Sequence, residues 1–312
     1  MFSSKLSGSR LVRLLATLLS VILVFVLLRR EWQQIAETIR QIEISRLLLV
    51  LLVMLVSRGF VTIRWHILLR SAGVNSSLSQ SSKITFAGLF ASNFLPSTVG
   101  GDLARMAGAL QANFDPTISA ASLIVDRVVG LAGMALAMPI GLQKLLLFQS
   151  SSTAFPMLAS QASWSGKLRN RASRILKKLL AAFKLWLAKP RALFLSLLAT
   201  LGHMTALFFT IALLLDSVGE EMSFLLIGGL WSLVYLITLV PFTINGLGLQ
   251  EVSISYAFSQ LGGIDLANSL VLALLIRTLF MLASLPGALF LSEVLPGISK
   301  AQPILDRIDD AS

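Results

Sequence analysis

The chain has 312 residues, of which 55% are hydrophobic and only 13% are charged, and its mean hydropathy is +0.82. Soluble domains carry about 25% charged residues, so this composition excludes a soluble globular protein and indicates an integral membrane protein. The chain has no cysteine, which excludes disulfides, thiolate catalysis and cysteine-ligated metal sites. The net charge of +11 fits cytoplasmic loops and anionic lipid headgroups, so we expect no nucleic-acid partner.

The first predicted helix covers residues 12–29 and follows several cations within residues 1–13. A signal peptide has a similar pattern, but two arginines and a glutamate follow the apolar run instead of the small residues of a cleavage site, which favours a retained helix. By the positive-inside rule the N-terminus is cytoplasmic, so this helix runs outward. A mixed-charge connector at 30–46 is expected to be partly helical.

Three apolar elements complete the first half of the chain. A helix at 47–70 returns to a polar cytoplasmic turn at 71–83. A first broken apolar segment then covers 84–111, and another helix covers 117–142. The sequence leaves open whether the broken segment crosses the membrane or re-enters it.

Residues 164–191 form the most basic part of the chain. They hold nine cations and no acid: Lys167, Arg169, Arg171, Arg174, Lys177, Lys178, Lys184, Lys189 and Arg191. The positive-inside rule places this segment in the cytoplasm, and apolar residues at three-four spacing predict an amphipathic helix on the inner leaflet. A solvated loop that only sets orientation is an equal alternative. The segment separates two halves, 10–163 and 192–292, of one membrane domain at 1–292.

The second half contains the same kinds of elements. A helix at 192–215 is followed by a second broken segment at 223–258, a last apolar stretch at 265–292 and a polar tail at 293–312. The chain is therefore predicted to be an all-α, polytopic transmembrane helix bundle of seven or eight spans.

The two broken segments share a short motif. Residues 96–101 and 241–246 both read Pro-x-Thr-(Val/Ile)-x-Gly, and an acid follows each of them, at Asp102 and at Glu251. One such motif in each half matches the scale of the structural repeats of membrane transporters. We therefore predict an internal repeat.

A break of this kind has a physical consequence within a membrane. Proline lacks an N–H and glycine lets the backbone leave helical geometry, so polar backbone groups are freed. Irregular backbone at membrane depth is tolerated only where it is buried in protein or lines a cavity. Asn93, Thr98, Thr243 and Asn245 can supply hydrogen bonds there. A proline-kinked helix with local repair is the alternative for one break, whereas two matching breaks favour a binding site.

Other charges also fall within apolar helices. Asp126 and Arg127 lie in the helix at 117–142, and Arg277 lies in the last apolar stretch. Adjacent residues do not face each other on a helix, so Asp126 and Arg127 each need another partner; a structural ion pair is the alternative to a functional role. Arg64 lies near the inner end of its helix and is expected to snorkel to the membrane surface.

Asp102 and Glu251 are placed where the helix after each break begins, so each can cap or complement its positive end. We hypothesise that the arginines converge on a phosphate while the acids balance them or carry protons: Arg105, Arg127 and Arg277 in the first set, and Asp102, Asp126 and Glu251 in the second.

Catalytic signatures are absent from the sequence. It contains no metalloprotease, nucleophile-elbow, P-loop or sugar-transferase metal motif. His66 and His203 have no metal-type partner at useful spacing, so both are expected to be packed polar residues. We therefore expect no catalytic residue, no metal, no cofactor and no enzyme activity.

Three segments, SNFLPSTVGGDLAR, VDRVVGL and PFTINGLGLQE, occur in this order and resemble the membrane domain of the lysylphosphatidylglycerol synthase family. This flippase-like family includes hopanoid-associated members. Its motif positions fall on Pro96, Ser97, Gly100, Gly101 and Arg105, on Asp126 and Arg127, and on Pro241, Gly246, Gly248 and Glu251. Asn245 stands where a glycine is common, and Asp126 replaces the usual glutamate. The resemblance covers residues 10–292.

Some members of this family are synthases that combine such a membrane unit with a cytosolic domain. For these members, the resemblance implies that the cytosolic domain makes aminoacylated phospholipid and the membrane unit translocates it. This chain is expected to be a stand-alone membrane unit without synthase activity. The resemblance and the paired breaks predict a lipid flippase, transporter or lipid-binding protein of the bacterial inner membrane, whose ligand is an anionic phospholipid or polyprenyl-type phosphate headgroup. One alternative is a non-catalytic scaffold that binds a lipid- or envelope-modifying enzyme through residues 164–191. An intramembrane transferase is the least favoured.

The residues expected to bind the headgroup belong to the two breaks and to the helices beside them: Asn93, Pro96, Ser97, Thr98, Gly100, Gly101, Asp102, Arg105, Asp126, Arg127, Pro241, Thr243, Asn245, Gly246, Gly248, Glu251 and Arg277.

Overall fold

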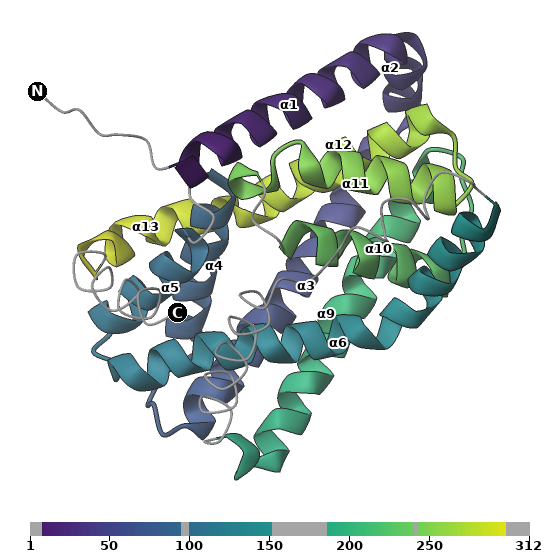
Figure 1. The fold of residues 1–312 in the computed structure, drawn as a ribbon. Coiled ribbons are helices and arrows are strands. Elements are labelled where there is room, and N and C mark those ends of the chain that lie inside the picture. The colour runs from purple at the N-terminus through teal and green to yellow at the C-terminus, as the bar shows by residue number, and fades with distance from the viewer. Residues whose placement is uncertain (1–7, 95–99, 152–185, 240–242, 298–312) are drawn as a thin grey trace, which may run out of the picture.

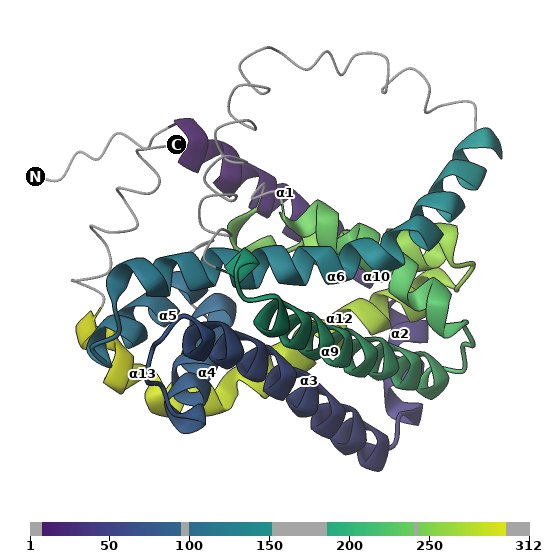
Figure 2. The same cartoon turned by 90° about the horizontal axis from the view of Figure 1, so that it is seen from below.

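The computed structural model describes residues 8–94, 100–151, 186–239 and 243–297. Within these ranges all regular structure is helical, which confirms the all-α prediction. Figure 1 shows the helices packed side by side as a bundle, and Figure 2 shows the same bundle from below.

The helices of the first half follow the predicted order. They are α1 (Gly8–Arg30), α2 (Trp32–Gln41), α3 (Ile44–Ser71), α4 (Leu78–Phe94), α5 (Gly100–Gln111) and α6 (Pro116–Ser151). The expected partly helical connector at 30–46 is confirmed by α2. Its Gln34 donates to Asp265 over 2.9 Å, which ties this short helix to the second half of the chain.

The second half begins with α9 (Pro190–Ser217) and α10 (Phe224–Leu239). A short turn, η1 (Ile244–Gly246), leads into α11 (Leu249–Tyr256), which continues as the π-helical turn η2 (Ala257–Leu261). The last helices are α12 (Leu266–Ser284), η3 (Leu285–Gly287), α13 (Ala288–Val294) and η4 (Leu295–Gly297). The tail at 293–312 was predicted to be polar from its first residue, but helical structure continues to Gly297.

The predicted polar turn at 71–83 is wrong in its length, because α4 begins at Leu78. The backbone N–H of Gln80 donates to the Ser77 hydroxyl over 3.1 Å, and the Ser77 N–H donates to the Gln80 side chain over 3.0 Å. This reciprocal pair is a capping box, which satisfies two N–H groups at the start of a helix. The polar residues of this stretch therefore start a helix rather than extend a turn.

Four helical stretches among the described residues are long and apolar enough to cross a membrane: Ile44–Ser71, Pro116–Phe148, Pro190–Ser217 and Leu266–Gly297. Together with the composition, they identify an integral membrane protein with several spans. The count of seven or eight spans stays a prediction.

Helices α3 and α9 pack against each other in opposite directions and define the two ends of the bundle. At one end, here called the Ser71 end, the Trp186 indole N–H donates to the Leu68 carbonyl over 3.2 Å. At the other, the Asp216 end, Arg46 pairs with Asp216. Helix α6 runs parallel to α9, so it ends towards the Asp216 end whereas α9 begins at the Ser71 end.

The first broken segment forms a hairpin of α4 and α5, here called the first hairpin. Gly88 lies against Gly101 and Arg105, and farther along Ile84 lies against Gly108, so the two helices are antiparallel. The hairpin begins and ends at the Ser71 end. A β-carbon on Gly88 would lie 2.9 Å from the Gly101 carbonyl oxygen, so the close approach of these two backbones requires glycine.

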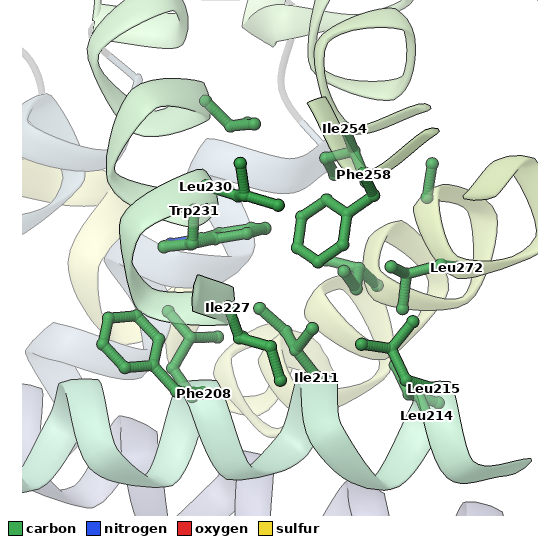
Figure 3. Packing of buried hydrophobic residues seen from close by; sticks show 14 of the residues in the cluster. Phe208, Ile211, Leu214, Leu215, Ile227, Leu230, Trp231, Ile254, Phe258 and Leu272 are labelled. Atoms are coloured by element: carbon green, nitrogen blue, oxygen red, sulfur yellow. The ribbon is translucent and has the colours of Figure 1, made fainter. Parts of the chain in front are cut away.

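The second broken segment forms a hairpin of α10 with α11 and η2, here called the second hairpin. Gly262, just after η2, lies against Met222 and Leu230 near the start of α10, so this chain also returns to the end at which it begins. That end is the Asp216 end. Figure 3 shows Trp231 of α10 and Phe258 of η2 in one apolar core with residues of α9 and α12.

The two hairpins therefore start from opposite ends of the bundle, and their tips meet. The side-chain amide of Asn245, in the second break, donates to the backbone carbonyl of Asn93, at the end of α4, over 3.3 Å. Each broken segment thus returns to the end of the bundle at which it begins. Whether it re-enters or crosses the membrane stays open. The internal repeat stays a prediction, which this opposite orientation supports.

Candidate functional site

The first hairpin is held by a buried group of charges around Asp126 of α6. Arg64 of α3 donates to this carboxylate over 2.7 Å, and Arg105 of α5 donates over 3.0 Å. Only 2% of Asp126 and 8% of each arginine are exposed. Arg64 was expected to snorkel to the membrane surface, and this expectation is wrong. Asp126 lies on the neighbouring helix α6, and its buried carboxylate pairs with Arg64. The arginine charge is therefore compensated inside the bundle and does not need to reach water.

The same group of charges continues to the surface of the bundle through Asp102. Arg127 donates to Asp102 over 2.6 Å, and Arg105 lies 3.9 Å from the other carboxylate oxygen. The Arg127 side chain is 58% exposed. Asp126 and Arg127 thus have different partners, as their adjacent positions on one helix predicted, and the group runs from a buried acid to an exposed cation.

Arg105 is fixed by an aromatic face as well as by the acids. Its guanidinium lies 4.5 Å from the centroid of the Trp65 ring, and Trp65 donates its indole N–H to Ser122 over 3.0 Å. The Nε and Nη2 groups of Arg105 are buried and make no hydrogen bond. A cation–π contact and two carboxylates therefore hold an arginine whose hydrogen-bonding capacity is only partly used.

The second hairpin has its own ion pair. Arg277 of α12 donates to Glu251 of α11 over 2.5 Å, and it also reaches the carbonyls of Gly246, at 3.2 Å, and Asn245, at 3.5 Å. Asn245, Gly246 and Gly248 all have positive φ angles, of 56°, 68° and 75°. Asparagine tolerates this conformation better than most residues, which explains how a residue other than glycine can occupy position 245.

Helix α1 covers the second tip, which the sequence reasoning did not foresee. The hydroxyl of Thr17 accepts from the backbone N–H of Ile244 over 2.8 Å, and Gly248 packs directly on Ser20. Both α1 residues are small and polar within an otherwise apolar run, which is the signal that could have identified them.

The predicted hydrogen-bonding roles at the breaks are only partly correct. Asn93 donates to Leu89 and Phe280, and Asn245 donates to Asn93, so both amides satisfy backbone carbonyls as expected. Thr243 was expected to do the same, but its hydroxyl is buried and makes no hydrogen bond. Four predicted positions, Pro96, Ser97, Thr98 and Pro241, lie outside the described residues, as do residues 164–185 of the basic segment.

The described ion pairs divide the predicted site into two groups. Arg105 and Arg127 belong to the first hairpin with Asp102 and Asp126, whereas Arg277 belongs to the second with Glu251. No ion pair among the described residues joins the two groups, so the ion pairs form two separate sets. The convergence of the three arginines on a phosphate stays a prediction. The link between the tips is the hydrogen bond from Asn245 to Asn93.

The histidines are packed polar residues, as predicted. His66 lies 2.9 Å from the Ser81 hydroxyl and His203 lies 2.7 Å from the Ser57 hydroxyl. Within the described part of the chain, no three acidic or histidine side chains are grouped closely enough to hold a metal ion. The sequence reasoning did miss a fifth arginine, Arg58 of α3, whose guanidinium lies 4.5 Å from the centroid of the Phe280 ring.

Comparison with known proteins agrees with these features. No curated protein matches the chain. The model of one protein family, described as the lysylphosphatidylglycerol synthase TM region, matches residues 13–287, which include both hairpins and all the charges of the site. The chain is therefore a member of the lysylphosphatidylglycerol synthase transmembrane-region family.

Proposed function

We propose that this protein binds a membrane lipid through an anionic phosphate headgroup and moves it across the bilayer. The observation that carries the proposal is the charge around the two hairpin tips. Five arginines face only three acids there: Arg58, Arg64, Arg105, Arg127 and Arg277 against Asp102, Asp126 and Glu251.

An excess of positive charge at membrane depth favours an anionic ligand. A charged side chain at the bilayer centre costs at least about 2.5–3.5 kcal/mol on insertion scales, and a bound anion offsets part of that cost. Phosphate suits arginine because its oxygens match the planar fork of guanidinium N–H groups. The headgroup is that of a phospholipid or of a polyprenyl-type phosphate.

The opposed hairpins suit transport as well as binding. In transporters built from inverted repeats, broken helices from opposite sides meet at a midplane site, and one repeat rocks against the other. Here Asn93 and Asn245 join the tips by one hydrogen bond, a contact that a rocking motion can break and remake. The acyl chains can stay in the surrounding lipid while only the headgroup passes between the hairpins.

The charges at the two ends support a bacterial inner-membrane protein whose Ser71 end faces the cytoplasm. The lining of a pocket of about 510 Å³ at that end includes three cations, Arg70, Lys189 and Arg191. The lining of a pocket of about 540 Å³ at the other end includes three acids, Asp216, Glu220 and Glu221. Cationic residues favour the anionic cytoplasmic leaflet.

A translocation assay in proteoliposomes tests the proposal. The full chain is reconstituted with a fluorescent anionic phospholipid, and the fraction accessible to an external quencher is followed with time. Arg127→Ala and Glu251→Ala each disturb one hairpin, and we expect each to slow translocation by about tenfold or more, since each removes one member of a charge pair. Transport at the wild-type rate in both variants would show that translocation does not depend on these two ion pairs and would overturn the proposed role of the hairpins.

A further inference from the structure

Arg58 occupies the middle of a membrane-spanning helix. Helix α3 extends from Ile44 to Ser71, and at a rise of 1.5 Å per residue Arg58 lies about 20 Å from either end. That distance is too long for an arginine side chain to reach water at a membrane surface. Arg46 and Arg70, by contrast, lie near the two ends of the same helix. The Arg58 charge must therefore be accommodated within the bundle.

Arg58 differs from the other four arginines around the hairpin tips because no carboxylate of a described residue pairs with it. Each of the others lies within 4 Å of a carboxylate, whereas Arg58 makes no ion pair with any described residue. Its guanidinium lies 4.5 Å from the centroid of the Phe280 ring. A cation–π contact offsets only part of the cost of removing a guanidinium from water. Arg58 is also only partly buried.

The surroundings of Arg58 place it beside the junction of the hairpin tips. Phe280 carries the ring under the guanidinium, and its carbonyl accepts from the Asn93 amide over 3.2 Å. Asn93 in turn accepts from Asn245 of the second tip. Trp231 meets the Phe280 ring edge-on at 6.0 Å between centroids, so an aromatic pair supports the position of the ring.

We propose that Arg58 is the residue that binds the phosphate of the headgroup, whereas the paired arginines hold the hairpins in place. This inference rests on the proposed function and deepens it. The guanidinium carries five N–H donors in one plane and makes no ion pair with a described residue, so it can offer two of them to two phosphate oxygens. The ligand is a lipid whose headgroup has a net negative charge, because a zwitterionic headgroup cannot neutralise the excess arginine.

A binding measurement with purified full-length protein tests this inference. The probe is short-chain phosphatidylglycerol, compared with short-chain phosphatidylcholine and with inorganic phosphate. We expect wild-type protein to prefer phosphatidylglycerol and Arg58→Gln to bind it about tenfold or more weakly, because a charged hydrogen-bond donor is lost. Arg46→Gln is the matched control, since it removes an exposed arginine from the same helix, and we expect its affinity to be unchanged.

Arg58→Lys keeps the charge without the planar fork and guards against a glutamine variant that does not fold. We expect it to fold and to bind with intermediate affinity. Phosphatidylglycerol binding at wild-type strength in Arg58→Gln or in Arg58→Lys would overturn the role of Arg58 and leave the proposed function standing. If wild-type protein does not prefer phosphatidylglycerol to phosphatidylcholine, this inference fails and so does an anionic phospholipid as the ligand of the proposed function. If inorganic phosphate binds as tightly as phosphatidylglycerol, the free ion is the ligand and the lipid assignment is wrong.

Discussion

The two hairpins carry the same ion pair in different surroundings. In the first, Asp102 is paired with Arg127, 25 residues later, and in the second Glu251 is paired with Arg277, 26 residues later. Each acid lies in the first turn of the helix after the break, and each arginine lies in the following long helix. One local pattern thus recurs in both halves, although the pairs start from opposite ends of the bundle.

The surroundings differ in what neutralises the charge. In the first hairpin, the pair continues into a buried set in which Asp126 serves both Arg64 and Arg105. In the second, the cation is shared between Glu251 and the carbonyls of a tight turn, and an apolar core supports the hairpin. The first hairpin therefore depends on charge balance, whereas the second depends on backbone geometry and apolar packing.

The largest expected effect is the loss of the acid that serves two arginines. Asp126→Asn leaves Arg64 and Arg105 buried without their common carboxylate, and breaking a buried ion pair costs about 3–5 kcal/mol. We expect a loss of that size in the free energy of unfolding, measured by titration with sodium dodecyl sulfate in mixed micelles. Asp216→Asn is the matched control. Its partner Arg46 is exposed, so it should cost less than about 1 kcal/mol.

An equivalent change in the second hairpin is expected to cost less. Glu251→Gln removes the charge beside Arg277, but the guanidinium keeps its hydrogen bonds to the backbone carbonyls of Gly246 and Asn245. The expected loss in the free energy of unfolding is about 1.5–3 kcal/mol, the range for one charged hydrogen bond. The same titration compares the two variants. If Glu251→Gln destabilises the protein more than Asp126→Asn, the second hairpin depends on charge balance as much as the first.

Sequence reasoning reached the membrane class, the helical fold and the two breaks, because hydropathy and the proline–glycine motifs are local signals. The sequence also predicted that Asp126 and Arg127 have separate partners, because adjacent residues point in different directions on a helix. It could not assign Arg64 to Asp126, since these residues are 62 positions apart and only helix packing brings them together. The start of α4 has a local signal as well, because Ser77 and Gln80 have the spacing of a capping box.

The smallest expected effect concerns a hydroxyl of the second break. The Thr243 hydroxyl is buried without a hydrogen bond, so Thr243→Val removes an unsatisfied polar group and keeps the side-chain shape. We expect a gain of up to about 1 kcal/mol in the free energy of unfolding. Thr200→Val is the matched control, because Thr200 accepts from Arg64 and donates to Ser196, and it should lose stability. If Thr243→Val lowers the free energy of unfolding as much as Thr200→Val does, the Thr243 hydroxyl has a hydrogen-bond partner. The second break would then also depend on side-chain hydrogen bonds.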